Sequence, residues 1–428
     1  MARSLELRAR RLRSLLVLGA LLASLPGTDP ALARPEPPDE PAPVNAPAAP
    51  AVRDLAATLE PIRAKHALPA LAGAIITGDG LIALGATGRR RVDHPEPVTT
   101  SDLWHLGSCT KAMTATLAAL LVERGTLTWT TTLADAFPDL APDMHADFRR
   151  VTLEQLCTNR GGVPGNLDAD GLWDKLWRHK GEPLEARREL LRGVVRRAPE
   201  YTPGTRTLYS NAGFAIAGHM CERAAGKPYE ALLRELLFEP LGMRSAGFGA
   251  PGAPEADPPD QPRGHRDGKP HEPTADGRGA DNPPAITPAG RVHASLGDWA
   301  RFVGLHLRGA RRLDPDAAPQ PAEQVGAITL RDETFRKLLT PPAEGTDYAF
   351  GWARTTRPWA RTRELGAPAA NTRPGTVFTH SGSNTLWFCV TWIAPGRDFA
   401  VLVCTNQGGD DGAKAADEAA WALIQQAP

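Results

Sequence analysis

Residues Gly107–Lys111 read Gly-Ser-Cys-Thr-Lys and carry the most informative pattern in this sequence of 428 residues. If Ser108 opens a helix, Ser108 and Lys111 are three residues apart and share one helix face. The lysine amine can then reach the serine hydroxyl, a weak nucleophile that needs a base. Lysine acts as that base only where burial or a nearby cation lowers its pKa. A helix N-terminus adds N–H groups and a positive dipole end that favour an oxyanion.

A Ser-x-x-Lys pattern alone is weak evidence, because a helix cap followed by an exposed lysine has the same sequence. A second segment, Pro203–Asn211 (PGTRTLYSN), places Tyr209 and Asn211 two residues apart after a Pro-Gly turn. A tyrosine hydroxyl can relay a proton, and an asparagine amide can both donate and accept hydrogen bonds. This segment supplies the groups that a serine nucleophile requires around it.

A third segment, Thr379–Ser383 (THSGS), opens one of the C-terminal strands. Gly382 lets a substrate approach the backbone closely, and the N–H of Ser383 can complete an oxyanion hole. Each segment alone is also explained by a core tyrosine, a turn asparagine or a surface histidine. The three segments together, in this order, predict a serine hydrolase.

The three segments resemble the motifs of penicillin-recognising serine hydrolases, that is, class C β-lactamases, D-alanyl-D-alanine carboxypeptidases and β-lactamase-fold esterases. The resemblance covers roughly Leu59 to the C-terminus. Further stretches that are similar to family sequences are Ser101–Ser108, Phe238–Met243, Pro288–Phe302 and Asp398–Asn406. The resemblance implies an α/β (α+β) fold of the β-lactamase/transpeptidase type, with an antiparallel sheet flanked by helices plus a mostly helical lobe.

The resemblance also implies roles for individual residues. Ser108 is expected to be acylated, Lys111 to take its proton, and Tyr209 to share the base role and protonate the leaving group. Asn211 is expected to hold Lys111 and the substrate. The remaining expected site residues are His380, Gly382 and Ser383, where the N–H groups of Ser108 and Ser383 form the oxyanion hole. No cofactor and no metal are implied.

Three positions depart from the family pattern. His380 replaces the lysine of a Lys-Thr-Gly motif, and histidine is cationic only part of the time near neutral pH. A fixed cation suits the carboxylate of a β-lactam or a peptide C-terminus. Arg160, within Asn159–Gly162, offers either a carboxylate clamp or a surface charge, and we favour the surface charge. Arg291 stands where a second glycine is common and is expected to narrow the cleft.

These departures favour an esterase or amidase acting on small acyl substrates. A D-amino-acid peptidase acting on cell-wall peptides is the next alternative, followed by a β-lactamase, because fold and nucleophile do not fix the substrate. A binding protein that senses cell-wall peptides or β-lactams without turnover has no need of Ser108, Lys111 and Tyr209 together. The partner is therefore expected to be a small ester, amide or peptide; the oligomeric state stays open.

The N-terminus predicts export. A basic stretch, Arg8–Arg13, precedes the apolar run Ser14–Leu25, and Ala31–Ala33 fits a small-x-small cleavage pattern. Residues 1–33 are therefore expected to be a signal peptide with cleavage near Ala33, which places the mature protein in the periplasm or outside the cell. An uncleaved anchor is the alternative. Residues 34–51, nearly all Pro, Ala, Glu and Asp, form an expected linker, and no stable membrane span is expected after cleavage.

Residues 52–428 are expected to form one domain in two lobes, with the helical lobe inserted at roughly 110–300. Helices are predicted over 52–64, 108–124, 295–308 and 413–425, and strands over 71–76, 80–86 and within 376–405. Residues 251–288 are dense in Pro, Gly and Asp and predict a long irregular insertion. Within the insertion, His265 and His271 suggest a metal only weakly, and a solvated loop is favoured.

Charge and cysteine content exclude other classes of function. Lys and Arg together number 49, as do Asp and Glu, so no net field attracts nucleic acid or an anionic membrane. The five cysteines lack the close paired spacing of a zinc site. Matching Ala394 with Phe399 across a Pro-Gly-Arg-Asp turn places Cys389 opposite Cys404. That pair is either a cross-strand disulfide or two buried neighbouring thiols.

Overall fold

The computed structural model describes residues 51–275, 279–313, 328, 330–361 and 375–428. The predicted signal peptide and all but the last residue of the predicted linker lie outside the described residues. Within those ranges, no helix combines the length and the apolar character needed to cross a membrane.

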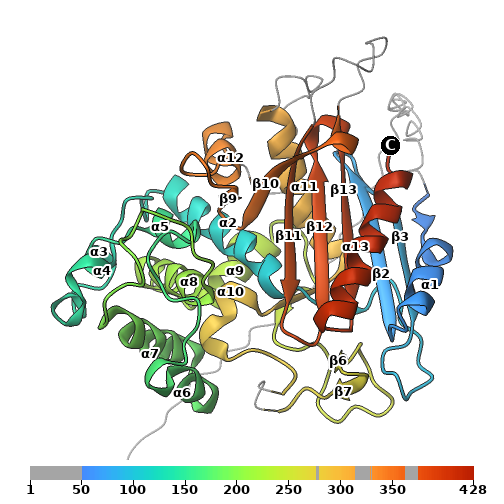
Figure 1. Ribbon diagram of the computed structural model, residues 1–428, viewed down its shortest axis with the longest axis horizontal. Helices are drawn as coiled ribbons and strands as arrows, with labels where there is room; N and C mark the ends of the chain where they lie inside the picture. The colour runs from blue at the N-terminus through green and yellow to red at the C-terminus, as the bar shows by residue number, and fades with distance from the viewer. Residues whose placement is uncertain (1–50, 276–278, 314–327, 329, 362–374) are drawn as a thin grey trace, which may run out of the picture. The chain divides into compact units, whose positions relative to one another are not determined.

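An eight-stranded sheet is the centre of the fold. Its strands are β1 (Arg53–Asp54), β2 (Ala70–Thr77), β3 (Gly80–Gly88), β9 (Tyr348–Ala349), β10 (Trp352–Arg357), β11 (Gly375–Ser383), β12 (Phe388–Ala394) and β13 (Phe399–Thr405). The strand order is β1-β3-β2-β13-β12-β11-β10-β9 (Figure 1), and every neighbouring pair is antiparallel except β1 with β3. Strands from both ends of the chain therefore share one sheet, as the sequence predicted.

The helices lie on both faces of this sheet and to one side of it (Figure 1). They are α1 (Ala56–Lys65), α2 (Thr110–Glu123), α3 (Leu133–Ala136), α4 (Ala146–Arg149), α5 (Leu153–Cys157), α6 (Leu172–Arg178), α7 (Pro183–Val195), α8 (Asn211–Ala225), α9 (Tyr229–Leu233), α10 (Thr287–Gly290), α11 (Leu296–Leu313), α12 (Asp332–Leu339) and α13 (Gly409–Gln426). Helices α1 and α13 pack on one face of the sheet, and α11 packs on the other.

Strand β13 shows why the late apolar run of the sequence is a strand. Its seven residues are all buried. Phe399, Val401 and Val403 face the core beneath α1 and α13, and the residues between them face the core beneath α11. A strand covered on both faces needs no polar alternation, so a continuous apolar run results. Each fully buried Val or Leu contributes about 1.5–3 kcal/mol to stability.

Two smaller sheets complete the strands. One joins β4 (Leu103–His105), β8 (Val292–Ser295) and β5 (Gly247–Phe248), and the other pairs β6 (Gly264–Arg266) with β7 (Lys269–His271). Strand β4 leads into a 3₁₀ turn at Gly107–Cys109, and α2 begins only at Thr110. The predicted helix start near Ser108 therefore falls in this 3₁₀ turn, two residues before α2 begins, and the three-residue spacing to Lys111 is kept.

Helix α2 is buried on nearly all sides, with twelve successive residues from Thr110 to Leu121 inside the protein. Its composition explains this placement, since most of its residues are alanine, leucine, methionine and threonine and Lys111 is its only cation. A helix that is apolar all round belongs in a core. The Gly107–Cys109 turn thus leads directly into a buried helix.

The predicted pairing of β12 with β13 is confirmed. Ala394 pairs with Phe399, and Cys389 pairs with Cys404. All five cysteines are buried and free, so the disulfide alternative is wrong for this structure and the two thiols are buried neighbours. Cys389 directs its thiol to the carbonyl of Leu106, 3.1 Å away, and not to a covalent partner.

The expected irregular insertion at 251–288 is mostly irregular, with β6 and β7 as its only strands in the described part. The solvated-loop interpretation of His265 is wrong, because the side chain is fully buried. Its backbone N–H donates to the carbonyl of Asn406 at 2.9 Å, and its ring Nε2 accepts from the N–H of Val92 at 3.2 Å. Burial lowers the pKa of His265. Neutral His265 therefore binds the 251–288 insertion to the residue that follows β13.

Candidate active site

The turn that carries Ser108 is pressed between β11 and α10. Gly107 has a φ of 47°, a left-handed conformation that glycine adopts at little cost. A Cβ at Gly107 would lie 2.3 Å from the backbone nitrogen of Ser383, which leaves no room for any other residue. Two backbone segments that are far apart in sequence therefore meet beside Ser108.

Lys111 lies one helical turn beyond Ser108 and is fully buried. Its Nζ is 3.0 Å from Ser108 Oγ, 2.7 Å from Asn211 Oδ1 and 2.8 Å from the carbonyl oxygen of Ala289. Burial lowers the pKa of Lys111 well below the ordinary value. Among the described residues, Lys111 forms no ion pair with any carboxylate. A neutral amine is the form that this environment favours.

The hydrogen-bond geometry fits a neutral Lys111. A neutral amine has two N–H donors and one lone pair. The oxygens of Asn211 and Ala289 can only accept, so they take both donors. The lone pair is then left for the hydroxyl of Ser108. This arrangement can remove the proton from Ser108 as its oxygen attacks a carbonyl carbon.

Tyr209 approaches Ser108 from the opposite side. Its hydroxyl donates to Ser108 Oγ at 2.6 Å, and Lys111 Nζ lies 4.6 Å from the centre of its ring. Desolvation raises the pKa of Tyr209 to about 12, against a smaller lowering by the hydrogen bond with Ser108. Tyr209 as a whole residue is nevertheless 43% exposed. The phenol is thus a protonated donor next to Ser108 Oγ.

Asn211 is the first residue of α8, and Ser210 is the N-cap. The segment before them is held by Asn159, which is buried and has a φ of 57°. Asn159 accepts at its backbone oxygen from the N–H of Leu208 at 2.8 Å and at Oδ1 from the N–H of Ser210 at 3.1 Å. Tyr209 lies between these two anchored residues, so its direction toward Ser108 is fixed.

Arg160 is partly buried and lies against the Pro-Gly turn at Gly204. Its guanidinium donates to the carbonyl of Gly204, and the N–H of Gly204 donates to the carbonyl of Arg160 at 2.7 Å. The side chain therefore holds the Pro-Gly turn that precedes Tyr209. Because the side chain is only partly buried, the choice between a surface charge and a carboxylate clamp stays a prediction.

His380 is buried on β11, with 9% of its surface exposed. Its Nδ1 lies 2.5 Å from the carbonyl of Ser381, so we assign the proton to Nδ1, and Nε2 then accepts from the hydroxyl of Tyr348 at 3.2 Å. Burial and the nearby Lys111 lower the pKa of His380 to about 4. The expectation of a partial charge is wrong: at neutral pH this position carries none.

Gly382 lies where the sequence placed it, but its role differs from the predicted one. A Cβ at Gly382 would lie 2.0 Å from the carbonyl oxygen of Leu106 and 2.9 Å from the nitrogen of Ser108. The space beside Gly382 is filled by the nucleophile turn and not by a substrate. Gly382 therefore brings β11 against that turn, which sets Ser383 beside Gly107 and makes an oxyanion hole from the Ser108 and Ser383 N–H groups sterically feasible.

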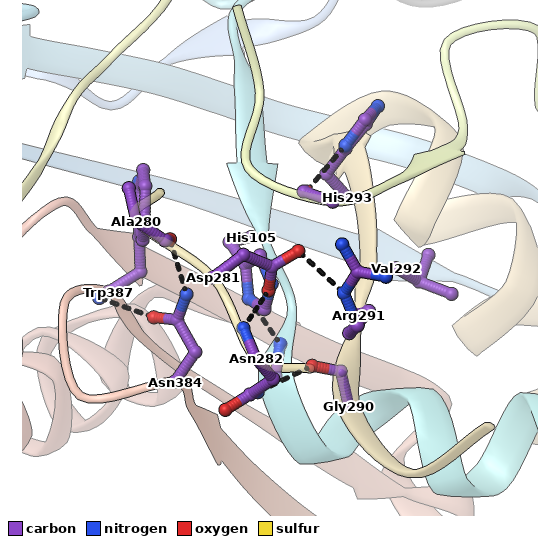
Figure 2. Close-up of polar contacts among 12 residues, drawn as sticks. His105, Ala280, Asp281, Asn282, Gly290, Arg291, Val292, His293, Asn384 and Trp387 are labelled. Carbon is purple, nitrogen blue, oxygen red and sulfur yellow. Dashed lines mark hydrogen bonds and ion pairs between the residues drawn. The ribbon is translucent and has the colours of Figure 1, made fainter. Parts of the chain in front are cut away.

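Arg291 does not narrow the cleft. Its side chain is buried, and its Nε donates to Asp281 Oδ2 at 2.7 Å (Figure 2). No group of three or more His, Cys, Asp or Glu side chains in the described chain could hold a metal ion. The site is thus built from Ser108, Lys111 and Tyr209 with amide and backbone groups around them.

Sequence reasoning missed three groups of this site. The Ala289 carbonyl binds Lys111, Asn159 orients the Tyr209 segment, and the Tyr348 hydroxyl contacts His380. A backbone carbonyl cannot be recognised from residue types. Tyr348 and Asn159 are far in sequence from the residues that they contact. The sequence pointed to only one of these groups: Asn159 lies next to Arg160, a position that departs from the family pattern.

Comparison with known proteins agrees with this geometry. The family model described as Beta-lactamase matches residues 55–426. Penicillin-binding protein 4 of Amycolatopsis lactamdurans is 26% identical over 359 residues, covering 81% of this chain and 83% of that protein. Unguisins hydrolase ungD of Aspergillus violaceofuscus is 25% identical over 280 residues, covering 60% of this chain and 47% of that protein, so the chain spans about half of that hydrolase.

Among solved structures, the D-alanine carboxypeptidase AmpC from Burkholderia cenocepacia shares the fold with a TM-score of 0.63 and 20% identity. The match covers 87% of this chain and 97% of that structure. The sheet order, the buried Ser-x-x-Lys helix and the match of a single family model over nearly all described residues agree with one another. The chain belongs to the β-lactamase family, whose members are serine hydrolases.

Proposed function

We propose that this protein is an exported serine hydrolase that forms an acyl-enzyme on Ser108 and acts on small esters or amides. The observation that supports the nucleophile is the convergence of Lys111 Nζ at 3.0 Å and the Tyr209 hydroxyl at 2.6 Å on one serine oxygen. Export is proposed from the basic, apolar and small-residue pattern of residues 1–33.

In the proposed acylation, Ser108 Oγ attacks the substrate carbonyl carbon while its proton passes to Lys111 Nζ. The new C–O bond leaves a tetrahedral intermediate, whose oxyanion accepts from the N–H groups of Ser108 and Ser383. The bond to the leaving group then breaks. Tyr209 gives its proton to the departing alkoxide or amine and regains one from Lys111. Deacylation repeats these transfers with water as the nucleophile.

The proposed substrate class rests on His380. With its pKa at about 4, this side chain is neutral at physiological pH and presents no fixed positive charge. A substrate carboxylate therefore lacks the cationic partner that a charged side chain at this position would give it. Uncharged acyl substrates have no carboxylate and need no cationic partner. Short esters and amides are therefore favoured over β-lactams and peptides with a free C-terminus.

A substrate panel tests the proposal. Purified protein is assayed against a short-chain nitrophenyl ester, D-amino-acid amides and a cephalosporin, in parallel with Ser108→Ala. We expect ester hydrolysis in the wild type and a loss of at least about 10³-fold in the variant, the size of loss seen when a nucleophile is removed. Unchanged activity in Ser108→Ala would sink the assignment. Faster turnover of the amide or the cephalosporin would shift the substrate class to a peptidase or a β-lactamase.

A serine-reactive probe distinguishes an enzyme from a sensor. We expect a fluorophosphonate or a fluorescent penicillin to label the wild type but not Ser108→Ala. Slow labelling without turnover of any ester or amide would indicate a non-catalytic binding protein instead.

A further inference from the structure

A buried polar cluster centred on Asp281 (Figure 2) reaches the turn before Ser108 through His105, and none of the proposed catalytic steps uses it. Its centre is Asp281, whose side chain is 0% exposed. The Asp281 carboxylate accepts from His105 Nε2, from Arg291 Nε and from the backbone N–H of Asn282, each at 2.7 Å. Three donors from two segments of the chain thus converge on one carboxylate.

Asp281 is ionised at neutral pH. Burial would raise its pKa, but the charge of Arg291 and the contact with His105 outweigh burial and hold the pKa below the ordinary value. A carboxylate accepts at both oxygens, so His105 must carry its proton on Nε2. The other ring nitrogen, Nδ1, is then free to accept, and the backbone N–H of Gly107 donates to it at 3.1 Å.

This chain of contacts ends at the turn that precedes Ser108. Gly107 is the left-handed residue against which Ser383 packs. A histidine in the other tautomer would present an N–H to the N–H of Gly107 and lose the contact. The Asp281 carboxylate therefore selects the tautomer that can hold the turn.

A second arm of the cluster reaches the other side of the site. Asn282 Nδ2 donates to the carbonyl of Gly290 at 3.1 Å (Figure 2). The preceding residue is Ala289, whose carbonyl binds Lys111 Nζ. A Cβ at Gly290 would lie 3.5 Å from the carbonyl carbon of Gly107, so the C-terminal end of α10 also packs on the Gly107–Cys109 turn. One buried cluster thus contacts both the turn with Ser108 and the residue that follows the Ala289 acceptor of Lys111.

We propose that Asp281 is a positioning residue for catalysis, which acts through His105 on the Gly107 turn and through Asn282 on the backbone that holds Lys111. This inference rests on the proposed function of Ser108. It predicts that the alignment of Ser108 with Lys111, and not the affinity for substrate, depends on Asp281. Misplacement by about 1 Å can cost about 100-fold in rate.

The primary test is a double-mutant cycle, in which kcat and KM are measured for Asp281→Asn, for His105→Asn and for the double variant. We expect Asp281→Asn to lower kcat for the ester by at least about tenfold while KM changes less than about threefold. An asparagine at 105 places Oδ1 where Nδ1 of the histidine lies, so it can accept from Gly107 in any protonation state of residue 281. In that background we expect Asp281→Asn to cost less than about threefold. An equal cost in both backgrounds would overturn the route through His105.

A second variant covers the case in which Asp281→Asn does not fold. His105→Gln keeps an N–H that reaches Asp281 and leaves the Asp281–Arg291 pair intact, but it removes the acceptor for Gly107. We expect this variant to fold and to lose kcat as Asp281→Asn does. Full turnover in His105→Gln would overturn the proposal.

Glu222→Gln is the matched control. Glu222 is also buried and paired with a buried arginine, Arg187, at 2.5 Å, but it lies three turns along α8 from the site. We expect a comparable loss of thermal stability with unchanged kcat per folded molecule. An equal loss of kcat in Glu222→Gln would show that any buried ion pair matters equally, and the positioning role would fail.

Hydrogen exchange separates this inference from the proposed function. We expect the peptide that contains Gly107 to exchange faster in Asp281→Asn but not in Glu222→Gln, whatever the turnover. If Ser108→Ala were fully active, the proposed nucleophile would fail while this exchange result still tested the cluster. Unchanged exchange at Gly107 in Asp281→Asn would overturn the positioning role itself.

Discussion

Lys111 shows how a single residue acquires its chemistry from its neighbours. An exposed lysine is protonated at neutral pH, but this one is fully buried and contacts only neutral oxygens. The desolvation that lowers its pKa converts it from a charge into a candidate base. The sequence gives its distance from Ser108 along a helix, but not its burial.

At the same scale, Tyr209→Phe removes the hydroxyl that donates to Ser108. We expect kcat to fall by about 10²–10⁴-fold, the usual contribution of a positioned proton donor, with the fold unchanged. Steady-state kinetics with circular dichroism measure this. Tyr229→Phe is the control, because that buried hydroxyl contacts Thr114 and not the nucleophile. An unaffected kcat in Tyr209→Phe would remove Tyr209 from the mechanism.

The pH dependence of kcat/KM reports the base. Because burial lowers the pKa of Lys111, we expect activity to rise as pH rises through that pKa and the amine loses its proton. His380, with a pKa of about 4, should add no inflection between pH 5 and 8. The profile of His380→Gln should therefore keep the shape of the wild-type profile over this range. An inflection of kcat/KM near pH 6.5 that is present in the wild type and absent in His380→Gln would contradict the assignment of His380 as neutral.

Between elements, the decisive feature is the contact of the Gly107–Cys109 turn with β11. The sequence located both segments and the β12–β13 register, because strand pairing across a short turn is a local property. The sequence did not reveal that Gly382 lets β11 pack closely against the Gly107–Cys109 turn, because that contact joins residues more than 270 positions apart.

Gly107→Ala tests this contact. The new Cβ would meet Ser383 at 2.3 Å in a left-handed conformation. We expect a loss of more than about 2 kcal/mol in the free energy of unfolding and of more than about 100-fold in kcat. Gly125→Ala is the matched control, with a φ of 72° and no atom within 4 Å of the added Cβ. It should cost about 1 kcal/mol and leave turnover unchanged. Equal effects of the two variants would show that the backbone conformation alone matters.

At the scale of the whole molecule, buried neutral histidines link stability to pH. His306 on α11 packs among the aromatic side chains of Phe302, Phe335 and Trp352. Its Nε2 lies 3.0 Å from Thr116 Oγ, and its Nδ1 has no hydrogen-bond partner among the described residues. Burial lowers its pKa from 6.5 to about 3. The unfolded chain binds a proton at this residue between these two values and the folded chain does not, so stability falls as pH falls through that window.

His306→Phe should flatten this dependence. Between pH 7.5 and pH 5 the wild type should lose about 2 kcal/mol of unfolding free energy through this residue, and the variant should not. The hydroxyl of Thr116 keeps its bond to the carbonyl of Ala112, so the substitution leaves no donor unpaired there. Urea unfolding at several pH values measures the difference. Parallel stability curves for the two proteins would show that the pKa of His306 is the same in the folded and unfolded states and would contradict this prediction.

The sequence by itself determined what depends on local spacing. It fixed the separation of Ser108 from Lys111, the pairing of Cys389 with Cys404 across a short turn, the main strands and helices, and the family. Only the tertiary structure decided which distant groups meet. It placed Asn211, Ala289 and Tyr209 around the nucleophile, made His380 neutral, and paired Arg291 with Asp281 behind the site. The physical reason is that burial and long-range contact set protonation and hydrogen bonding, and neither is encoded in the spacing of residues along the chain.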